Sequence, residues 1–217
     1  MAEMTLNIKK THSERLMPLL DQMLTESGIE REEIEAIAAA AGPGSFTGLR
    51  IGVSTARALA QALNIPAVPV CTLQALAEAA PSPGTLICPV LDARRKQVYT
   101  ALFKRSTQAP YNLETLIAPT ALDLDELIEA LQSFDQPVIF LGEGLHTYAP
   151  VLNEAMPSAQ IAPAPLRLCR AGLVAYRARQ ILRERPNASY LELLPYYLRR
   201  PEAERLAEER QQQGGSL

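Results

Sequence analysis

The sequence predicts an α/β protein with a mixed sheet, and three observations support this prediction. Short apolar runs typical of buried strands alternate with segments whose apolar residues recur at helical spacing, which favours a sheet with parallel strands. Two strand-like runs, residues 85–93 and 97–105, flank the polar turn at 94–96, which indicates an antiparallel hairpin. The 217 residues are 47% hydrophobic and 21% charged, so the chain can bury a core.

The first part of the chain predicts two helices around a short strand. Residues 1–10 alternate loosely, like the end of a strand. A helix is predicted over 11–27, where leucines and methionines recur at i, i+3, i+4 and i+7, and Gly28 ends it. The apolar run at 35–41 predicts a strand. Residues 46–64 predict a second long helix, which Asn64 closes before Pro66.

Further strands and helices alternate beyond this second helix. A short strand is predicted at 67–70, followed by a helix at 72–80 with Thr72 as its cap. After the hairpin, the pattern predicts a strand near 112–117, a helix near 120–133, a strand at 137–142, a helix at 145–155 and a final helix at 167–184.

The chain is expected to form two lobes. A Pro- and Gly-containing segment at 81–84 separates the helix-rich start from the hairpin region, so we place the first lobe at 1–82 and the second at 83–200. Residues 201–217 are charged and end in Gln, Gly and Ser, a composition that predicts a flexible tail.

Composition excludes several classes of protein. The net charge is −3 and the basic residues are scattered, so strong direct binding to nucleic acid is not expected. Cys71, Cys88 and Cys169 form no C-x-x-C pair and are expected to pack in the core rather than form a disulfide framework or a zinc site. The start has no secretory pattern, and no apolar run reaches the length of a membrane span, so we expect a cytoplasmic protein without a membrane partner.

The segment AGPGSFTGLRIG at 41–52 is the most distinctive motif. A strand, a glycine-rich turn and a helix start can cradle an anion, because backbone N–H groups converge there. A P-loop, however, requires Lys after its last glycine, and Leu49 follows Gly48 here. A loop that positions the helix is therefore the favoured interpretation over phosphate binding, and no cofactor is expected.

Small residues recur at every fourth position of the second helix. Gly48, Gly52, Ala56 and Ala60 form one ridge without bulky side chains. Such a ridge lets another helix approach closely. The ridge can pack inside the monomer or against a helix of another chain, and the pattern alone leaves both alternatives open.

Candidate catalytic residues do not form a recognisable set. His12 and His146 lack a partner at i+4, so we predict no metal ligands. Asp92 ends a strand and is interpreted as a turn carboxylate, with a ligand-binding role as the alternative. Ser45 does not lie in a nucleophile-elbow pattern. Glu143 lies in a G-E-G turn, where it would repel phosphate and could contact only the ribose or base of a nucleotide. We therefore predict no catalytic residue.

Five segments together resemble the bacterial TsaB family, also called YeaZ. They occur in the same order as in that family and extend over essentially the whole chain, and GPGSFTGLRIG is the most specific of their patterns. The segments are THSERLMPLL at 11–20, AAAAGPGSFTGLRIGVSTARALA at 38–60, LDARRKQVY at 91–99, LGEG at 141–144 and PYYLRRPEAE at 195–204.

The resemblance implies a fold and a role. The fold is the actin-like ASKHA (ribonuclease H-like) fold, with two lobes and mixed sheets. The role is that of a non-catalytic subunit that binds the catalytic subunit TsaD, together with the ATPase TsaE, in threonylcarbamoyl transfer to the tRNA adenosine next to the anticodon. A homodimer is implied in the absence of TsaD, and tRNA binding only through the complex.

The resemblance also implies an interface and a departure from the family. The family pairs through its first two helices, here 11–27 and 46–63, so the expected interface residues are His12, Leu16, Gly48, Gly52, Ala56 and Ala60. Family members begin with about two further strands that carry a phosphate loop, and these N-terminal strands are expected to be missing here. ATP or ADP would then bind only at a subunit junction. The alternative function, a stand-alone ATP-dependent kinase or peptidase, requires a phosphate loop or a metal pair.

Overall fold

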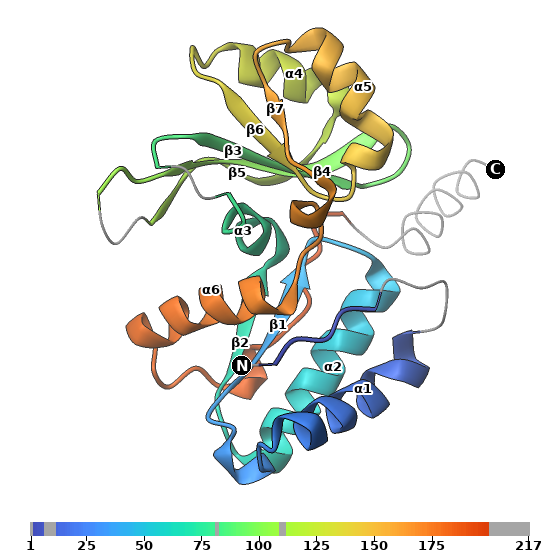
Figure 1. Ribbon diagram of the computed structural model, residues 1–217, viewed down its shortest axis with the longest axis vertical. Helices are drawn as coiled ribbons and strands as arrows, with labels where there is room; N and C mark the ends of the chain where they lie inside the picture. The colour runs from blue at the N-terminus through green and yellow to red at the C-terminus, as the bar shows by residue number, and fades with distance from the viewer. Residues whose placement is uncertain (1, 7–11, 81–82, 109–111, 200–217) are drawn as a thin grey trace, which may run out of the picture.

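The computed structural model describes residues 2–6, 12–80, 83–108 and 112–199 (Figure 1). A two-stranded parallel sheet pairs β1 (Ile37–Gly42) with β2 (Ala67–Cys71). The helix α2 (Phe46–Leu63) connects them, because parallel neighbours need a crossover. Both strands and α2 confirm the predicted elements to within a few residues.

A mixed five-stranded sheet forms the other part of the molecule, in the order β5-β4-β3-β6-β7. The strands β3, β4 and β5 are antiparallel neighbours, whereas β3, β6 and β7 are parallel. The predicted mixed sheet and hairpin are therefore confirmed. The strands are β3 (Leu86–Asp92), β4 (Gln97–Arg105), β5 (Leu113–Asp123), β6 (Val138–Leu141) and β7 (Gln160–Ile161).

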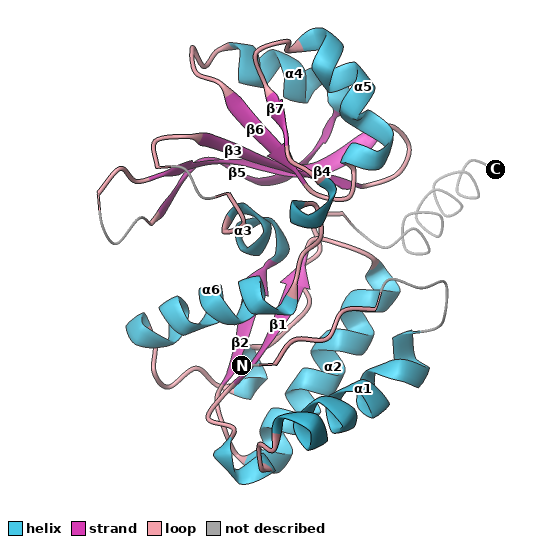
Figure 2. Ribbon diagram, in the orientation of Figure 1, coloured by secondary structure: helices cyan, strands magenta, loops and turns pink. Residues whose placement is uncertain are grey.

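Helices cover both faces of this five-stranded sheet (Figure 2). Alternate residues of β3 point to opposite faces: Leu86, Cys88 and Val90 pack toward α4 and α5, whereas Ile87 and Leu91 pack toward α3. None of the described helices has the length and apolar character needed to cross a membrane. The remaining helices are α1 (His12–Ser27), α3 (Thr72–Ala77), α4 (Leu124–Gln132), α5 (Leu145–Ala155) and α6 (Ala171–Glu184), with short 3-10 turns at 31–33, 164–166 and 190–192.

The last helix returns to the first sheet. Val174 and Ala178 of α6 pack with Val68 and Val70 of β2, on the face opposite α2. Figure 1 shows α6 beside β1 and β2 although it follows the five-stranded sheet in the sequence. The expected division at residues 82 and 83 would assign α6 to the second lobe, whereas its contacts are with the first sheet; the division itself stays a prediction.

Three local expectations need correction. Residues 2–6 are not a strand. The strand β5 continues to Asp123, beyond the predicted end at 117, because its residues keep pairing with β4. The helix α3 ends at Ala77 and its N-cap is Cys71, so the hydroxyl of Thr72 does not cap it.

Candidate partner interface

The helix α1 carries an apolar stripe that is only half-buried. Its leucines and methionines follow helical spacing, yet none of the four buried clusters among the described residues includes a side chain of α1. The five side chains of the stripe are partly exposed, and Met17, which lies next to Leu16 in the sequence, is 48% exposed. An apolar stripe left partly in contact with water gains free energy when a partner covers it, about 25 cal/mol per Å² of apolar area. The stripe consists of Leu16, Leu19, Leu20, Met23 and Leu24.

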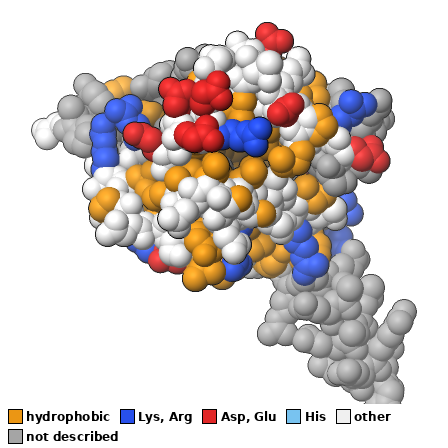
Figure 3. All heavy atoms as spheres, turned by 90° about the horizontal axis from the view of Figure 1, so that it is seen from below, with side chains coloured by type: hydrophobic (Ala, Val, Ile, Leu, Met, Phe, Trp, Pro, Cys, Tyr) orange, Lys and Arg blue, Asp and Glu red, His pale blue; other side chains and the backbone are white. Residues whose placement is uncertain are grey.

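The helix α2 lies beside α1 and is divided into an inner and an outer face. Leu49, Val53, Ala56 and Ala60 point inward and are buried. A second face is half-exposed and includes Gly48, Gly52 and Leu59. Figure 3 looks at this end of the molecule and shows hydrophobic side chains spread across the middle of the face, with many of the acidic side chains toward one edge.

The structure divides the predicted small-residue ridge in two. Ala60 is 0% exposed and Ala56 is 8% exposed, and both pack against Ala41, Ala67 and other core residues. They therefore cannot meet another chain, and the expectation for these two residues is corrected: they serve the chain's own core. Only the half of the ridge that contains the two glycines remains open.

No close contact among the described residues requires a glycine at position 52. Among the described residues, a Cβ atom placed there would meet no atom within 4 Å beyond its own neighbours and helix backbone. At Gly48 a Cβ would only touch Cβ of Ser45 at 3.5 Å, an ordinary contact. Glycine inside a helix is less stable than alanine by about 1 kcal/mol. The two glycines thus reduce the stability of the isolated chain, and the space that they leave is open to another chain.

The start of α2 is fixed by its cap and by a distant aromatic residue. The Gly48 N–H donates to the Ser45 hydroxyl at 3.4 Å, which makes Ser45 the N-cap. The guanidinium of Arg50 lies over the ring of Phe46 at 4.1 Å and donates to the Tyr197 hydroxyl at 3.3 Å. The rings of Phe46 and Tyr197 are 4.9 Å apart. Sequence reasoning missed this cluster, since it contains no local pattern.

The glycine-rich loop packs against the chain itself. Gly42 has φ 132°, and a Cβ there would collide with the carbonyl oxygen of Tyr196. The Tyr196 N–H also donates to the Ala41 carbonyl at 2.6 Å. The close approach at Gly42 thus accommodates the backbone of residue 196. This supports the interpretation of the loop as one that positions α2.

The G-E-G turn at residues 142–144 also allows a close contact between backbone segments. Gly142 has φ 110°, and a Cβ there would collide with the carbonyl oxygen of Val90. Gly144 donates its N–H to that same oxygen at 3.0 Å. These two glycines therefore let the turn after β6 approach β3. Glu143 between them is exposed.

Asp92 acts as a turn carboxylate. Its Oδ1 accepts from the backbone N–H of Arg94 at 2.7 Å and from the Tyr148 hydroxyl at 3.3 Å. Burial, and then the neighbouring Asp92 charge, raise the pKa of the Tyr148 hydroxyl. The turn that Asp92 begins contains three successive residues with positive φ, Arg94, Arg95 and Lys96. Asp92 thus contacts the turn backbone at Arg94 and the α5 residue Tyr148; such contacts are typical of a turn carboxylate, and the alternative ligand-binding role stays a prediction.

The remaining candidate residues do not converge on a reaction centre. His12 is the first residue of α1, and its side chain lies outside the described part. His146 is exposed on α5. Across the described ranges, no three His, Cys, Asp or Glu side chains gather as metal ligands.

The cysteines pack as predicted. Cys88 is fully buried, and Cys71 and Cys169 contact a second buried cluster. Burial raises the pKa of the Cys88 and Cys169 thiols to about 12. These two thiols therefore stay protonated at neutral pH, and a thiolate nucleophile is not available from them.

Comparison with known proteins agrees with the fold. A solved structure described as "YeaZ from Pseudomonas aeruginosa" matches with a TM-score of 0.71 and 24% sequence identity, over 87% of this chain and 86% of that chain. The family model "TsaD: tRNA N6-adenosine threonylcarbamoyltransferase" matches residues 2–207. The fold and these matches define an actin-like α/β protein with mixed sheets, of the ASKHA class.

Sequence relatives narrow this class to one family. The chain is 34% identical over 210 residues to "tRNA threonylcarbamoyladenosine biosynthesis protein TsaB" of Bacillus subtilis (strain 168), which corresponds to 94% of this chain and 86% of that protein. The protein of the same name from Haemophilus influenzae is 28% identical over 199 residues, or 88% of this chain and 81% of that protein. The chain belongs to the TsaB (YeaZ) family, which confirms the resemblance found in its motifs.

Proposed function

We propose that this chain is the non-catalytic subunit that binds the catalytic subunit TsaD in the synthesis of threonylcarbamoyladenosine on tRNA. Curated relatives named for that pathway support the pathway. Two observations support binding: the open space at Gly52 of α2 and the half-buried apolar stripe on the neighbouring helix α1. Together, His12, Leu16, Leu20, Met23, Gly48 and Gly52 define the α1–α2 surface.

The chemistry of this surface fits a pair of helices from another chain. The leucines and methionines of α1 supply apolar area, and the glycines of α2 let a helix backbone approach closely. A second copy of this chain presents the same two helices, so a symmetric homodimer would use the same surface. Binding of TsaD and self-association would then exclude each other.

The proposal assigns no chemistry to this chain. Asp92 is occupied by a backbone N–H and by Tyr148, and the glycines at 42, 142 and 144 serve close backbone contacts. The ATPase TsaE and the tRNA would join through the complex, and a nucleotide would lie only at a junction between subunits. The net charge of −3 agrees with a tRNA site supplied mainly by a partner.

The test is a substitution that fills the open space. Gly52→Leu should weaken both self-association and retention of TsaD by several kcal/mol if the contact is central, because added bulk separates the helices. The folded monomer should persist, since the Cβ at Gly52 meets no neighbour within 4 Å. Light scattering and co-purification with TsaD measure the two effects, and the melting temperature reports on the fold.

Ser54→Leu is the matched control. Ser54 is exposed and lies about 200° around the helix from Gly52, so it adds bulk on the other side of α2. It should leave both associations unchanged. The proposal fails if Gly52→Leu keeps TsaD bound, or if it lowers the melting temperature strongly while association persists, because the ridge would then pack within the monomer.

A further inference from the structure

The charges of this chain are divided unevenly along the sequence. Residues 106–166 contain eight Asp or Glu and no Lys or Arg, whereas the rest of the chain holds all 21 Lys and Arg with the other 16 of its 24 acidic residues. The acidic segment includes α4 and α5, which cover one face of the five-stranded sheet. The outer side of these two helices is therefore a source of negative potential.

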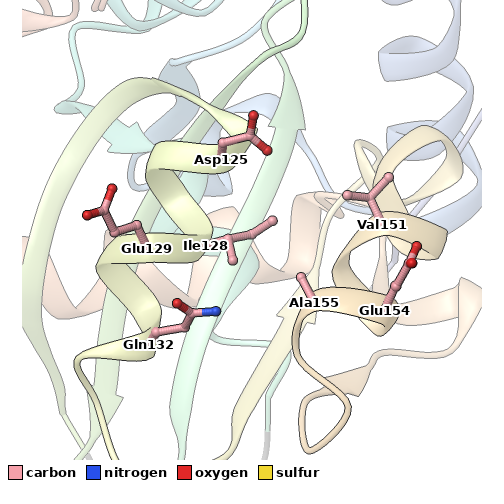
Figure 4. A pocket seen from close by; sticks show the side chains of 7 residues that line it. All are labelled: Asp125, Ile128, Glu129, Gln132, Val151, Glu154 and Ala155. Carbon is pink, nitrogen blue, oxygen red and sulfur yellow. The ribbon is translucent and has the colours of Figure 1, made fainter.

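A groove of about 320 Å³ runs between α4 and α5. Leu127 and Leu131 of α4 and Leu152 of α5 are buried beneath it, so the two helices are held on the sheet. Figure 4 shows Ile128 pointing from α4 toward α5, with Val151 and Ala155 on the facing side. Val151 is 43% exposed. The groove therefore has an apolar floor that is accessible to solvent.

The rim of the groove is acidic. Asp125 and Glu129 of α4 and Glu154 of α5 line it, and all three are exposed. Among the ion pairs that the structure describes, none involves these carboxylates. Asp125, Ile128, Glu129 and Gln132 share one face of α4, since they are spaced i, i+3, i+4 and i+7. Acidic and apolar groups thus alternate along one line.

We propose that this groove binds a cationic amphipathic segment of another protein, one in which Lys or Arg flank an apolar side chain. The apolar side chain would contact Ile128 and Val151, and the cations would meet Asp125, Glu129 and Glu154. Nucleic acid and anionic lipid would be repelled by the same carboxylates. Figure 1 shows α4 and α5 at the opposite end of the molecule from α1 and α2, so the groove stays accessible when the α1–α2 surface is covered. This proposal does not depend on the proposed function.

Fluorescence anisotropy tests the proposal with the full chain. The probe is a short fluorescein-labelled helical peptide of Leu, Lys and Ala with its leucines on one face, compared with the same peptide carrying Glu in place of Lys. The Lys peptide should bind, and more weakly as salt rises, because the contacts are exposed ion pairs. The triple variant D125K/E129K/E154K should weaken binding about tenfold or more, as three attractions become repulsions.

A control variant with the same change of net charge distinguishes the effect of the groove carboxylates on peptide binding from the effect of the overall charge. E114K/D135K/E143K reverses three exposed carboxylates outside the groove and should change binding by less than about threefold. If the groove variant unfolds by circular dichroism, Val151→Asn alone should still weaken binding by about tenfold, because it removes apolar area from the floor without changing the charge. Equal weakening by both triple variants, binding of the Glu peptide, or unchanged binding in Val151→Asn would each overturn the proposal.

Discussion

At the scale of single residues, the glycines of this chain are of two kinds: some are required by the fold, and one leaves open space on a helix surface. Gly42 and Gly142 have positive φ and lie against a carbonyl oxygen, so the fold itself requires them. Gly52 lies in a regular helix with open space at its Cβ position. The amino-acid sequence alone does not distinguish these two kinds of glycine. The three-dimensional surroundings separate a glycine needed for folding from one that keeps a surface flat.

Alanine substitutions should therefore have opposite effects on stability. Gly52→Ala should raise the free energy of unfolding by about 0.5–1 kcal/mol, because alanine favours the helix and meets no obstacle. Gly42→Ala should lower it by more than about 2 kcal/mol, since Cβ would collide with Tyr196 and φ 132° disfavours any side chain. Urea unfolding measures both changes. A destabilised Gly52→Ala would show that the space beside α2 is occupied within the monomer.

At the scale of elements, periodicity predicted which segments are helices and strands, and long-range pairing decided where they end. The strand β4 and the helix α5 match their predicted ranges, 97–105 and 145–155. In contrast, β5 extends to Asp123 because β4 offers backbone partners that far. A capping box between Asp123 and Glu126 then begins α4. The local sequence at 118–123 cannot show the partner strand, which lies elsewhere in the chain.

The candidate interface was also predictable only in part, because local spacing is visible in the sequence whereas long-range contacts are not. The spacing of Gly48, Gly52, Ala56 and Ala60 predicts a shared ridge, but the ridge curves around the helix, because four residues advance more than one turn. Its Ala56 and Ala60 end therefore turns into the core. The Arg50 contact with Tyr197 joins residues 147 positions apart, and no local pattern could indicate it.

The two apolar helices α1 and α5 should respond differently to substitution. Leu20→Lys places a charge on the half-buried stripe of α1; it should cost about 1 kcal/mol or less in unfolding free energy and abolish self-association. Leu152→Ala removes a fully buried side chain of α5 and should cost about 2–5 kcal/mol, with association retained. Urea titration measures the stability of each variant, and light scattering measures its self-association. A large loss of stability in Leu20→Lys would place the α1 stripe in the core of the monomer.

At the scale of the whole molecule, a buried ion pair joins the five-stranded sheet to the segment that follows α3. Arg105 of β4 donates to the carbonyl oxygens of Ala77 and Ala80 at 3.1 and 3.0 Å and to the Glu78 carboxylate at 3.1 Å. The side chains of Arg105 and Glu78 are 9% and 3% exposed. Arg177 of α6 lies 3.9 Å from the same carboxylate. The residues after α3 thus connect the five-stranded sheet to the helix that packs on the two-stranded sheet.

Glu78→Ala should destabilise the whole molecule. Without the carboxylate, the buried guanidinium of Arg105 loses its contact with Glu78 at 3.1 Å, and the loss of one partner from such a pair costs about 3–5 kcal/mol. Arg105→Met alone should also destabilise the molecule, because the carbonyl oxygens of Ala77 and Ala80 lose this donor and Glu78 keeps only Arg177 of its two cationic neighbours. The double variant should cost less than the sum of the two, since no unpaired charge of this pair remains buried. Urea unfolding of all three variants gives the coupling energy.

Glu192→Ala is the control: it breaks the exposed pair with Arg185 and should change stability by less than about 0.5–1 kcal/mol. Additive effects of the two core substitutions would show that the Glu78 and Arg105 side chains do not stabilise each other.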